Sequence, residues 1–192
     1  MDAALTLHAE HGMNASTFAA RVTAGTLADM HSACVSAIGT LKGPLHGGAN
    51  EQVMHMLLQI ESPETAPDFV RGLLEKGEKV MGFGHRVYRT LDPRAPVLKK
   101  LAEQLAEEGV GDAKWLQISE KIQKTMREEM DRKGKQIYPN VDFFSASVYY
   151  TLGIPLDLFT NLFACARMAG WTAHVNEQLK DNRLIRPQSV YI

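Results

Sequence analysis

The chain has 192 residues, of which 45% are hydrophobic and 22% charged, and its formal net charge is −1. This size and composition are typical of a globular protein with one domain or two small ones. They exclude a general attraction to nucleic acid or to an anionic membrane, and no run of about 18 apolar residues is present to span a bilayer.

The first half of the chain contains three helical patterns. Between Asp29 and Leu41 apolar residues recur every three or four positions, which predicts an amphipathic helix that ends at Lys-Gly-Pro. Asn50 is a candidate N-cap for a helix over residues 51–60. The stretch 62–77, closed by Gly77, predicts another short helix.

The second half continues in the same way. Four further helices are predicted from apolar residues at helical spacing, over residues 95–109, 112–134, 140–153 and 155–182. Alternation of period two is confined to residues 79–84, so we predict an all-α fold. Residues 183–192 have no period and two arginines, and we expect an extended tail that docks on another surface.

Three breaks in the helical pattern collect the side chains that can do chemistry. They place His46 in "GPLHGGANE", His85 and Arg94 in "GFGHRVYRTLDPR", and Asp142 in "YPNVDF". A carboxylate with two imidazoles suits removal of a proton from a carbon beside a carbonyl, with donors that stabilise the oxygen. Arginines would bind carboxylates of the substrate. The sequence therefore points to an enzyme that acts on a small acidic carbonyl compound.

Other kinds of site fit the sequence less well. "GFGHRV" lacks the third glycine of a dinucleotide-binding loop. Glu51 and His55, with His46 upstream, lack a convincing third metal ligand, so we predict no metal. Cys165 lies in an apolar helical run, where a buried and inert thiol is expected. Since Cys34 is the other cysteine, we expect no disulfide and a cytoplasmic location.

Six segments, in chain order, resemble the carboxyl-terminal half of bacterial citrate synthases. They are "LHAEHGMNASTFAARV", "GPLHGGANE", "GFGHRVYRTLDPR", "PNVDFFSASVYYTLGI", "FACARMAGWTAHVNEQ" and "RLIRPQS", and together they cover nearly all of the chain. The resemblance implies an all-α fold with a large and a small domain. Residues 1–46 and 154–192 would belong to the large domain, and residues 47–153 would form the small one.

The resemblance also implies an activity, the condensation of acetyl-CoA with oxaloacetate to citrate and CoA. Asp142 would be the base that takes a proton from the acetyl methyl group. His46 would hydrogen-bond the thioester oxygen, and His85 would polarise the ketone of oxaloacetate. No tightly bound cofactor is implied, because CoA enters and leaves as part of substrate and product.

Binding residues follow from the same resemblance. Oxaloacetate would be held by His11, Arg94, Phe163 and Arg167, and CoA by Gly82, Phe83, Gly84 and Arg89. Arg186 in the tail would reach the active site of a neighbouring subunit, so a homo-oligomer (a dimer or higher) is expected. Chains of the family are about twice as long, which suggests an amino-terminal partner.

Several alternatives remain open. The enzyme could be a 2-methylcitrate synthase that uses propionyl-CoA, although Leu45 and Arg86 favour citrate synthase. The chain could also be a catalytically silent oligomerisation or interaction fragment. Asp142 could cap its helix, and His85 could bond to backbone. Arg94 could pair with Asp92, and Arg167 with a buried acid.

Overall fold

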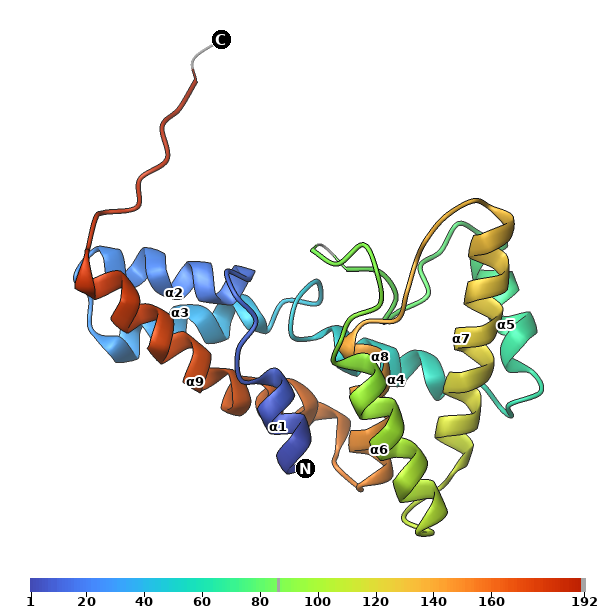
Figure 1. Ribbon diagram of the computed structural model, residues 1–192. Coiled ribbons are helices and arrows are strands. Elements are labelled where there is room, and N and C mark those ends of the chain that lie inside the picture. Colours follow the sequence, from blue (N-terminus) through green and yellow to red (C-terminus); the bar gives the residue numbers. More distant parts are fainter. Residues whose placement is uncertain (86, 191–192) are drawn as a thin grey trace. The chain divides into compact units, whose positions relative to one another are not determined.

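The computed structural model describes residues 1–85 and 87–190, and the chain divides into two compact units (Figure 1). Unit 1 comprises Met1–Gly48 and Thr160–Ile192, and unit 2 comprises Ala49–Phe159. Within the described residues all regular elements are helices, and β-type pairing is limited to an isolated bridge between Phe83 and Pro139. The predicted all-α fold is confirmed. The assignment of residues 1–46, 47–153 and 154–192 to a large and a small domain stays a prediction.

Unit 1 is built from helices at both ends of the chain. They are α1 (Asp2–His8), α2 (Ala15–Gly25), α3 (Met30–Leu41) and α9 (Phe159–Lys180). The Asn14 side chain caps α2 by accepting from the Thr17 N–H, and Asp29 caps α3 by accepting from the Ser32 N–H. Helix α3 matches the prediction, whereas α1 and α2 were not predicted as helices. Residues 183–190 follow α9 without secondary structure, as expected.

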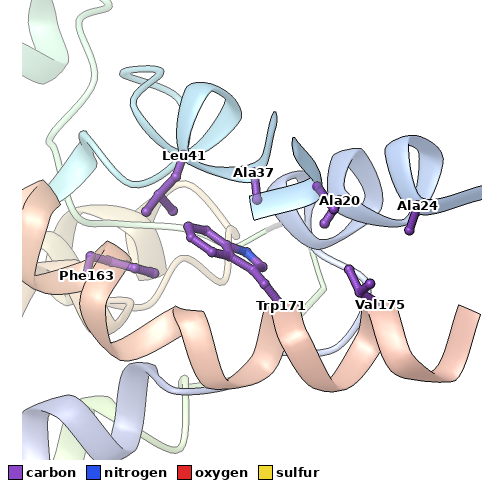
Figure 2. Close-up of a cluster of buried hydrophobic side chains, with 8 residues drawn as sticks. Ala20, Ala24, Ala37, Leu41, Phe163, Trp171 and Val175 are labelled. Carbon is purple, nitrogen blue, oxygen red and sulfur yellow. The ribbon is translucent and has the colours of Figure 1, made fainter. Parts of the chain in front are cut away.

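The core of unit 1 joins α2, α3 and α9 around one large ring. Trp171 of α9 is fully buried, and Figure 2 shows it projecting toward small residues of the other two helices. The buried cluster consists of Ala20, Ala24, Ala33, Ala37, Leu41, Phe163, Trp171 and Val175. The alanine side chains are small, and the indole of Trp171 fills the space that they leave between the three helices.

Unit 2 packs five α-helices and a 3-10 turn. These are α4 (Ala49–Leu57), α5 (Ala66–Glu75), α6 (Ala95–Glu107), α7 (Lys114–Arg132), α8 (Val141–Thr151) and η1 (Leu156–Leu158). Helix α8 contacts α4, α6 and α7, and all seven residues from Phe143 to Tyr149 are buried. A helix that is apolar on every side is stable only in such a central position.

Three expectations about the helices of the two units are wrong, and the helix predicted over residues 62–77 is confirmed with a later start. Helix α4 starts at Ala49, so Asn50 lies in its first turn, fully buried, and is not its N-cap. Helix α5 starts at Ala66, because Pro67 is accepted only in a first turn. The last predicted helix is divided, since η1 follows Pro155 before α9 begins. Cys165 on α9 is exposed.

The turn that leads to His85 depends on Gly82, whose φ is +79°. A Cβ there would lie 2.9 Å from Cβ of Phe143 and 2.9 Å from Cγ2 of Val53. Gly77 has a φ of +72° but no neighbour within 4 Å of such a Cβ. The two positions therefore share a backbone conformation and differ in the available space.

We predict that Gly82→Ala lowers the free energy of unfolding more than Gly77→Ala does. Both variants lose about 1–2 kcal/mol from the left-handed backbone, and Gly82→Ala loses about 1–3 kcal/mol more from overpacking. Urea unfolding of the two variants measures the difference. Equal losses would contradict the packing seen around Gly82.

Candidate active site

His46 lies in the tight loop after α3, where its ring meets the first turn of α2. The Ser16 backbone N–H donates to Nε2 of His46 at 3.3 Å, and Oγ of Ser16 lies 2.9 Å from the same nitrogen. A backbone N–H can only donate, so Nε2 is an acceptor and the neutral ring carries its proton on Nδ1. The local structure therefore makes Nδ1 the donor of a neutral His46 ring.

The surroundings of His46 also oppose its protonation. Burial, and then the positive charge of Arg167, lower the pKa of His46 to about 4. The Arg167 guanidinium is itself buried, donates from Nε to the His8 carbonyl at 2.6 Å, and lies 4.8 Å from the centre of the Phe163 ring. Phe163 in turn contacts the His46 ring edge to face, with centroids 6.5 Å apart.

One alternative that the sequence leaves open for Arg167 is a buried ion pair with an acid. Arg167 is buried, and its Nε donates to the His8 carbonyl, a backbone group. His11 lies in the segment between α1 and α2, half-buried, and its carbonyl accepts from Nδ2 of Asn14 at 3.4 Å. His46, Phe163, Arg167 and the His11 segment all belong to unit 1.

In His85 of unit 2 the acceptor nitrogen is Nδ1, whereas in His46 it is Nε2. Its Nδ1 accepts from the backbone N–H groups of Val87 and Tyr88 at 3.0 and 3.1 Å. The neutral ring therefore carries its proton on Nε2. Burial lowers the pKa of His85, Asp92 opposes this shift and Arg94 adds to it. The backbone bonds expected as an alternative are present, and they leave His85 suited to donate from Nε2.

A cavity of about 200 Å³ opens beside His85. Its walls are mostly polar and are formed by Gly84, His85, Tyr88, Arg89, Thr90, Asp92, Gln136, Ile137, Tyr138 and Pro139. The Gly84 N–H donates to the Tyr138 carbonyl at 2.8 Å, and Nδ2 of Asn140 donates to the Gly84 carbonyl at 3.0 Å. Gly84 and Arg89, predicted to bind CoA, therefore line the same cavity as His85.

Gly82 and Phe83, the other two predicted CoA residues, lie just before this cavity. The Gly82 carbonyl accepts from the Asn140 N–H at 2.9 Å. The Phe83 ring packs on Phe143 of α8, with centroids 4.7 Å apart. These contacts fix the 82–84 segment against the start of α8.

Arg94 forms a buried bidentate ion pair with Asp92. Its Nη2 and Nε donate to the two carboxylate oxygens at 2.8 and 3.0 Å. Oδ2 of Asp92 also accepts from the Val141 N–H at 3.2 Å. Burial opposes ionisation of Asp92, but the hydrogen bonds and charge of Arg94 outweigh it and the pKa is lowered. The expected local pair exists, and it ties Arg94 to the start of α8.

Asp142 is the second residue of α8 and is half-buried. Oδ1 of Asn140 accepts from the Asp142 N–H at 3.0 Å, so Asn140 caps the helix and the alternative that Asp142 does so is wrong. A carboxylate in a first turn is stabilised by the helix dipole. Burial, and then the charge of Asp142, raise the pKa of Tyr149.

The remaining candidates are placed as follows. Arg186 lies in the exposed tail, and its Nη1 donates to the Pro187 carbonyl at 3.3 Å. Glu51 and His55 form an ion pair at 3.6 Å, and no group of three metal-ligating side chains gathers within residues 1–85 and 87–190. Across those same residues, no helix has the length and hydrophobicity needed to cross a bilayer. Arg86 and residues 191–192 lie outside the described residues.

The residues that orient these groups carry little local signal in the sequence. Ser16 is 30 positions from His46, and Trp171, which donates from Nε1 to Oγ of Ser16 at 3.0 Å, is 155 positions from Ser16. Asn140 carries a weak signal, since an asparagine before an apolar run is a typical N-cap. Asp92 was considered only as a partner of Arg94.

Comparison with known proteins identifies what the chain is similar to. A family model described as "Citrate synthase, C-terminal domain" matches residues 1–188. Citrate synthase of Haloferax volcanii is 53% identical over 99% of this chain and 49% of its own length. The 2-methylcitrate synthase of Shewanella oneidensis is 48% identical over 100% of this chain and 50% of its own.

A solved structure agrees with these matches. Citrate synthase of Thermoplasma acidophilum, in a ternary complex with carboxymethyl coenzyme A and oxaloacetate by its description, superimposes with a TM-score of 0.89 at 42% identity. The match covers 98% of this chain and 50% of that one. The chain thus spans about half the length of the proteins that it matches.

We predict that His46 stays neutral down to unusually low pH. Because its folded-state pKa is about 4 and its ordinary value is 6.5, the folded chain binds fewer protons between these values. The free energy of unfolding should therefore fall as the pH drops from 6.5 to 4, by roughly 1–2 kcal/mol from His46, because solvent screens the partly exposed ring. NMR titration of the ring, and urea unfolding of His46→Gln against pH, measure both effects. A ring signal with its midpoint near 6.5 would contradict the burial of His46.

We predict that Asp92→Asn destabilises unit 2 by about 3–5 kcal/mol, because it leaves the buried Arg94 charge uncompensated. Asp112→Asn is the matched control, since Asp112 is exposed and its Oδ1 accepts from the Lys114 backbone N–H at 2.9 Å. Its loss should be about 1 kcal/mol or less. Urea unfolding compares the two, and similar losses would mean that the Asp92–Arg94 pair contributes little.

Proposed function

The chain belongs to the citrate synthase family, and on this basis we propose that it forms the catalytic half of an enzyme that condenses acetyl-CoA with oxaloacetate. The products are citrate and CoA. The observation that carries the proposal is that backbone hydrogen bonds fix which nitrogen is protonated in the neutral rings of His46 and His85. Backbone N–H groups donate to Nε2 of His46 and to Nδ1 of His85, so each neutral ring carries its proton on the other nitrogen.

Asp142 is the base in this proposal. Its carboxylate takes a proton from the methyl group of acetyl-CoA, and the thioester oxygen gains charge as the enol or enolate forms. Nδ1–H of His46 donates to that oxygen. A neutral imidazole suits this role, because its fixed dipole stabilises the developing charge without first having to gain a proton.

His85 prepares the second substrate. Nε2–H of His85 donates to the ketone oxygen of oxaloacetate, which makes the carbonyl carbon a better electrophile. The acetyl carbon attacks it, a carbon–carbon bond forms, and the ketone oxygen takes the Nε2 proton of His85 to become the hydroxyl of citryl-CoA. The proton that Asp142 removed from the acetyl group balances this transfer. Water then cleaves the thioester and releases citrate and CoA.

Arginines supply the binding energy for the two acids of oxaloacetate. Arg94 and Arg167 are both buried, where a guanidinium interacts strongly with a carboxylate. His11 is proposed as a further ligand of oxaloacetate, and Phe163 as an aromatic contact of the same substrate. The cavity beside His85, with Gly84 and Arg89 in its wall, is proposed for CoA, together with Gly82 and Phe83.

We also propose that the chain acts as a homo-oligomer in the cytoplasm. Apolar side chains are exposed on unit 1, with Val35 at 67%, Phe18 at 47% and Ile38 at 42%. Exposed patches of this kind often mark subunit contacts. Arg186 in the extended tail is proposed to enter a neighbouring subunit's site. The other half of the enzyme would come from an amino-terminal partner or segment.

Relatives of both kinds match the chain, a citrate synthase at 53% identity and a 2-methylcitrate synthase at 48%. One methylene in an apolar pocket is worth only about 1–3 kcal/mol. We favour acetyl-CoA because of Leu45 and Arg86, with propionyl-CoA as the second candidate.

We predict CoA release when the chain, joined to an amino-terminal half from the same family, receives acetyl-CoA and oxaloacetate. Asp142→Ala and His46→Ala should each lower kcat by at least about 100-fold, because each removes a group that acts on the reacting atoms. Asp131→Ala and His31→Ala, at exposed positions on α7 and α3, are the matched controls.

The outcomes separate the candidate functions. A higher kcat/KM with propionyl-CoA would make the enzyme a 2-methylcitrate synthase. No CoA release with either thioester, from the chain alone or joined to its partner half, would leave an interaction fragment. Full turnover in Asp142→Ala or His46→Ala would remove that residue from the mechanism.

A further inference from the structure

One face of α9 holds the segment that carries His11 at three successive points. Nε of Arg167 donates to the His8 carbonyl at 2.6 Å, and the Gly170 N–H donates to the Ala9 carbonyl at 3.0 Å. Nε2 of His174 lies 2.9 Å from Oε1 of Glu10. Positions 167, 170 and 174 are spaced by three and four, so they share a face of the helix and meet residues 8, 9 and 10 in turn.

The middle contact requires a glycine. A Cβ on Gly170 would lie 2.5 Å from the Ala9 carbonyl oxygen and 3.2 Å from Cα of Glu10. The segment therefore lies directly on the helix backbone at this point. The contact between His174 and Glu10 is the last of the three along the helix.

Glu10 encloses His11 within a small hydrogen-bonded ring. Its Oε1, the atom bonded by His174, also accepts from the Gly12 backbone N–H. His11 is the residue between them. The hydrogen bond to His174 is the largest cause of a lowered pKa at Glu10, burial opposes it, and Gly12 and Arg167 add to it.

A second carboxylate lies near the other side of the His174 ring. Oε2 of Glu177, one turn along α9, is 2.9 Å from Nδ1 of His174, but without hydrogen-bond geometry. Glu177 pairs with Nη1 of Arg21 at 3.3 Å, so α2 also fixes this arrangement. The His174 side chain is 17% exposed, whereas those of Glu10 and Glu177 are 54% and 59% exposed. An imidazole between two carboxylates has a defined orientation even where the carboxylates reach solvent.

We propose that His174 is a positioning residue that orients His11, and through the same segment Arg167, toward oxaloacetate. The role of oxaloacetate rests on the proposed function above. His174 acts through Glu10, whose carboxylate fixes the backbone on both sides of His11. Removing the imidazole would free Glu10 and loosen residues 10–12, while the core around Trp171 stays intact.

The test compares His174→Phe, which keeps a ring without nitrogen, with His174→Gln, whose amide can still donate to Glu10. In His174→Phe the amides of residues 10–12 should exchange hydrogen about tenfold faster, as expected for loss of one charge-assisted bond. His174→Gln should restore most of the protection. His31→Phe, on the exposed surface of α3, is the matched control.

A second measurement uses the chain joined to an amino-terminal half of the family, the form in which we expect CoA release. KM for oxaloacetate should rise in His174→Phe by about tenfold, with KM for acetyl-CoA unchanged and kcat lowered less than in Asp142→Ala. A merely structural role would lower the active fraction without changing KM.

The outcomes distinguish the two proposals. Unchanged exchange at residues 10–12 in His174→Phe, or faster exchange without a change of KM for oxaloacetate, would overturn the positioning role. A wild-type chain that binds no oxaloacetate, as measured by calorimetry, would refute the proposed function and the orientation of His11 toward that substrate. Faster exchange in His174→Phe would in that case still show that His174 fixes the segment.

Discussion

A backbone hydrogen bond from Ser16 to Nε2 of His46 governs what unit 1 can do chemically. The Ser16 N–H belongs to the first turn of α2, where helix geometry leaves amides without a helical partner. Asn14 accepts from Thr17, one residue further on, and the histidine accepts from Ser16. Trp171 holds Ser16 Oγ from the alanine-lined core, so core packing places the donor and thereby sets the protonation of the imidazole.

Unit 2 uses the same principle with the other ring nitrogen. Two backbone N–H groups within the loop itself donate to Nδ1 of His85, so this orientation needs no distant partner. The distant contacts of unit 2 serve a different purpose. Asp92 balances the buried charge of Arg94 and accepts from Val141, and Asn140 holds both the 82–84 turn and the first turn of α8. One network of hydrogen bonds thus connects the loop that carries His85 with the helix that carries Asp142.

Local sequence patterns correctly predicted helices whose formation depends on interactions between near neighbours in the chain. Apolar spacing predicted α3, α6 and α7, because each buries one stripe of its surface. The same reasoning failed at Asn50, which fits a cap by type but is buried within the first turn of α4. It also missed α1 and α2. At the candidate site, junctions between helices pointed to His46, His85 and Asp142, while Ser16 and His174 had no local signal.

By itself, the sequence determined the all-α class, the family, and the set of acids, bases and arginines available for chemistry. Only the tertiary structure decided which nitrogen of each imidazole is the acceptor, which charges are buried in pairs, and that Asn140 and not Asp142 caps α8. The physical reason is distance along the chain. Side-chain types and helical periods are local properties, whereas burial and hydrogen bonding depend on partners such as Ser16 and Trp171, which are 155 positions apart.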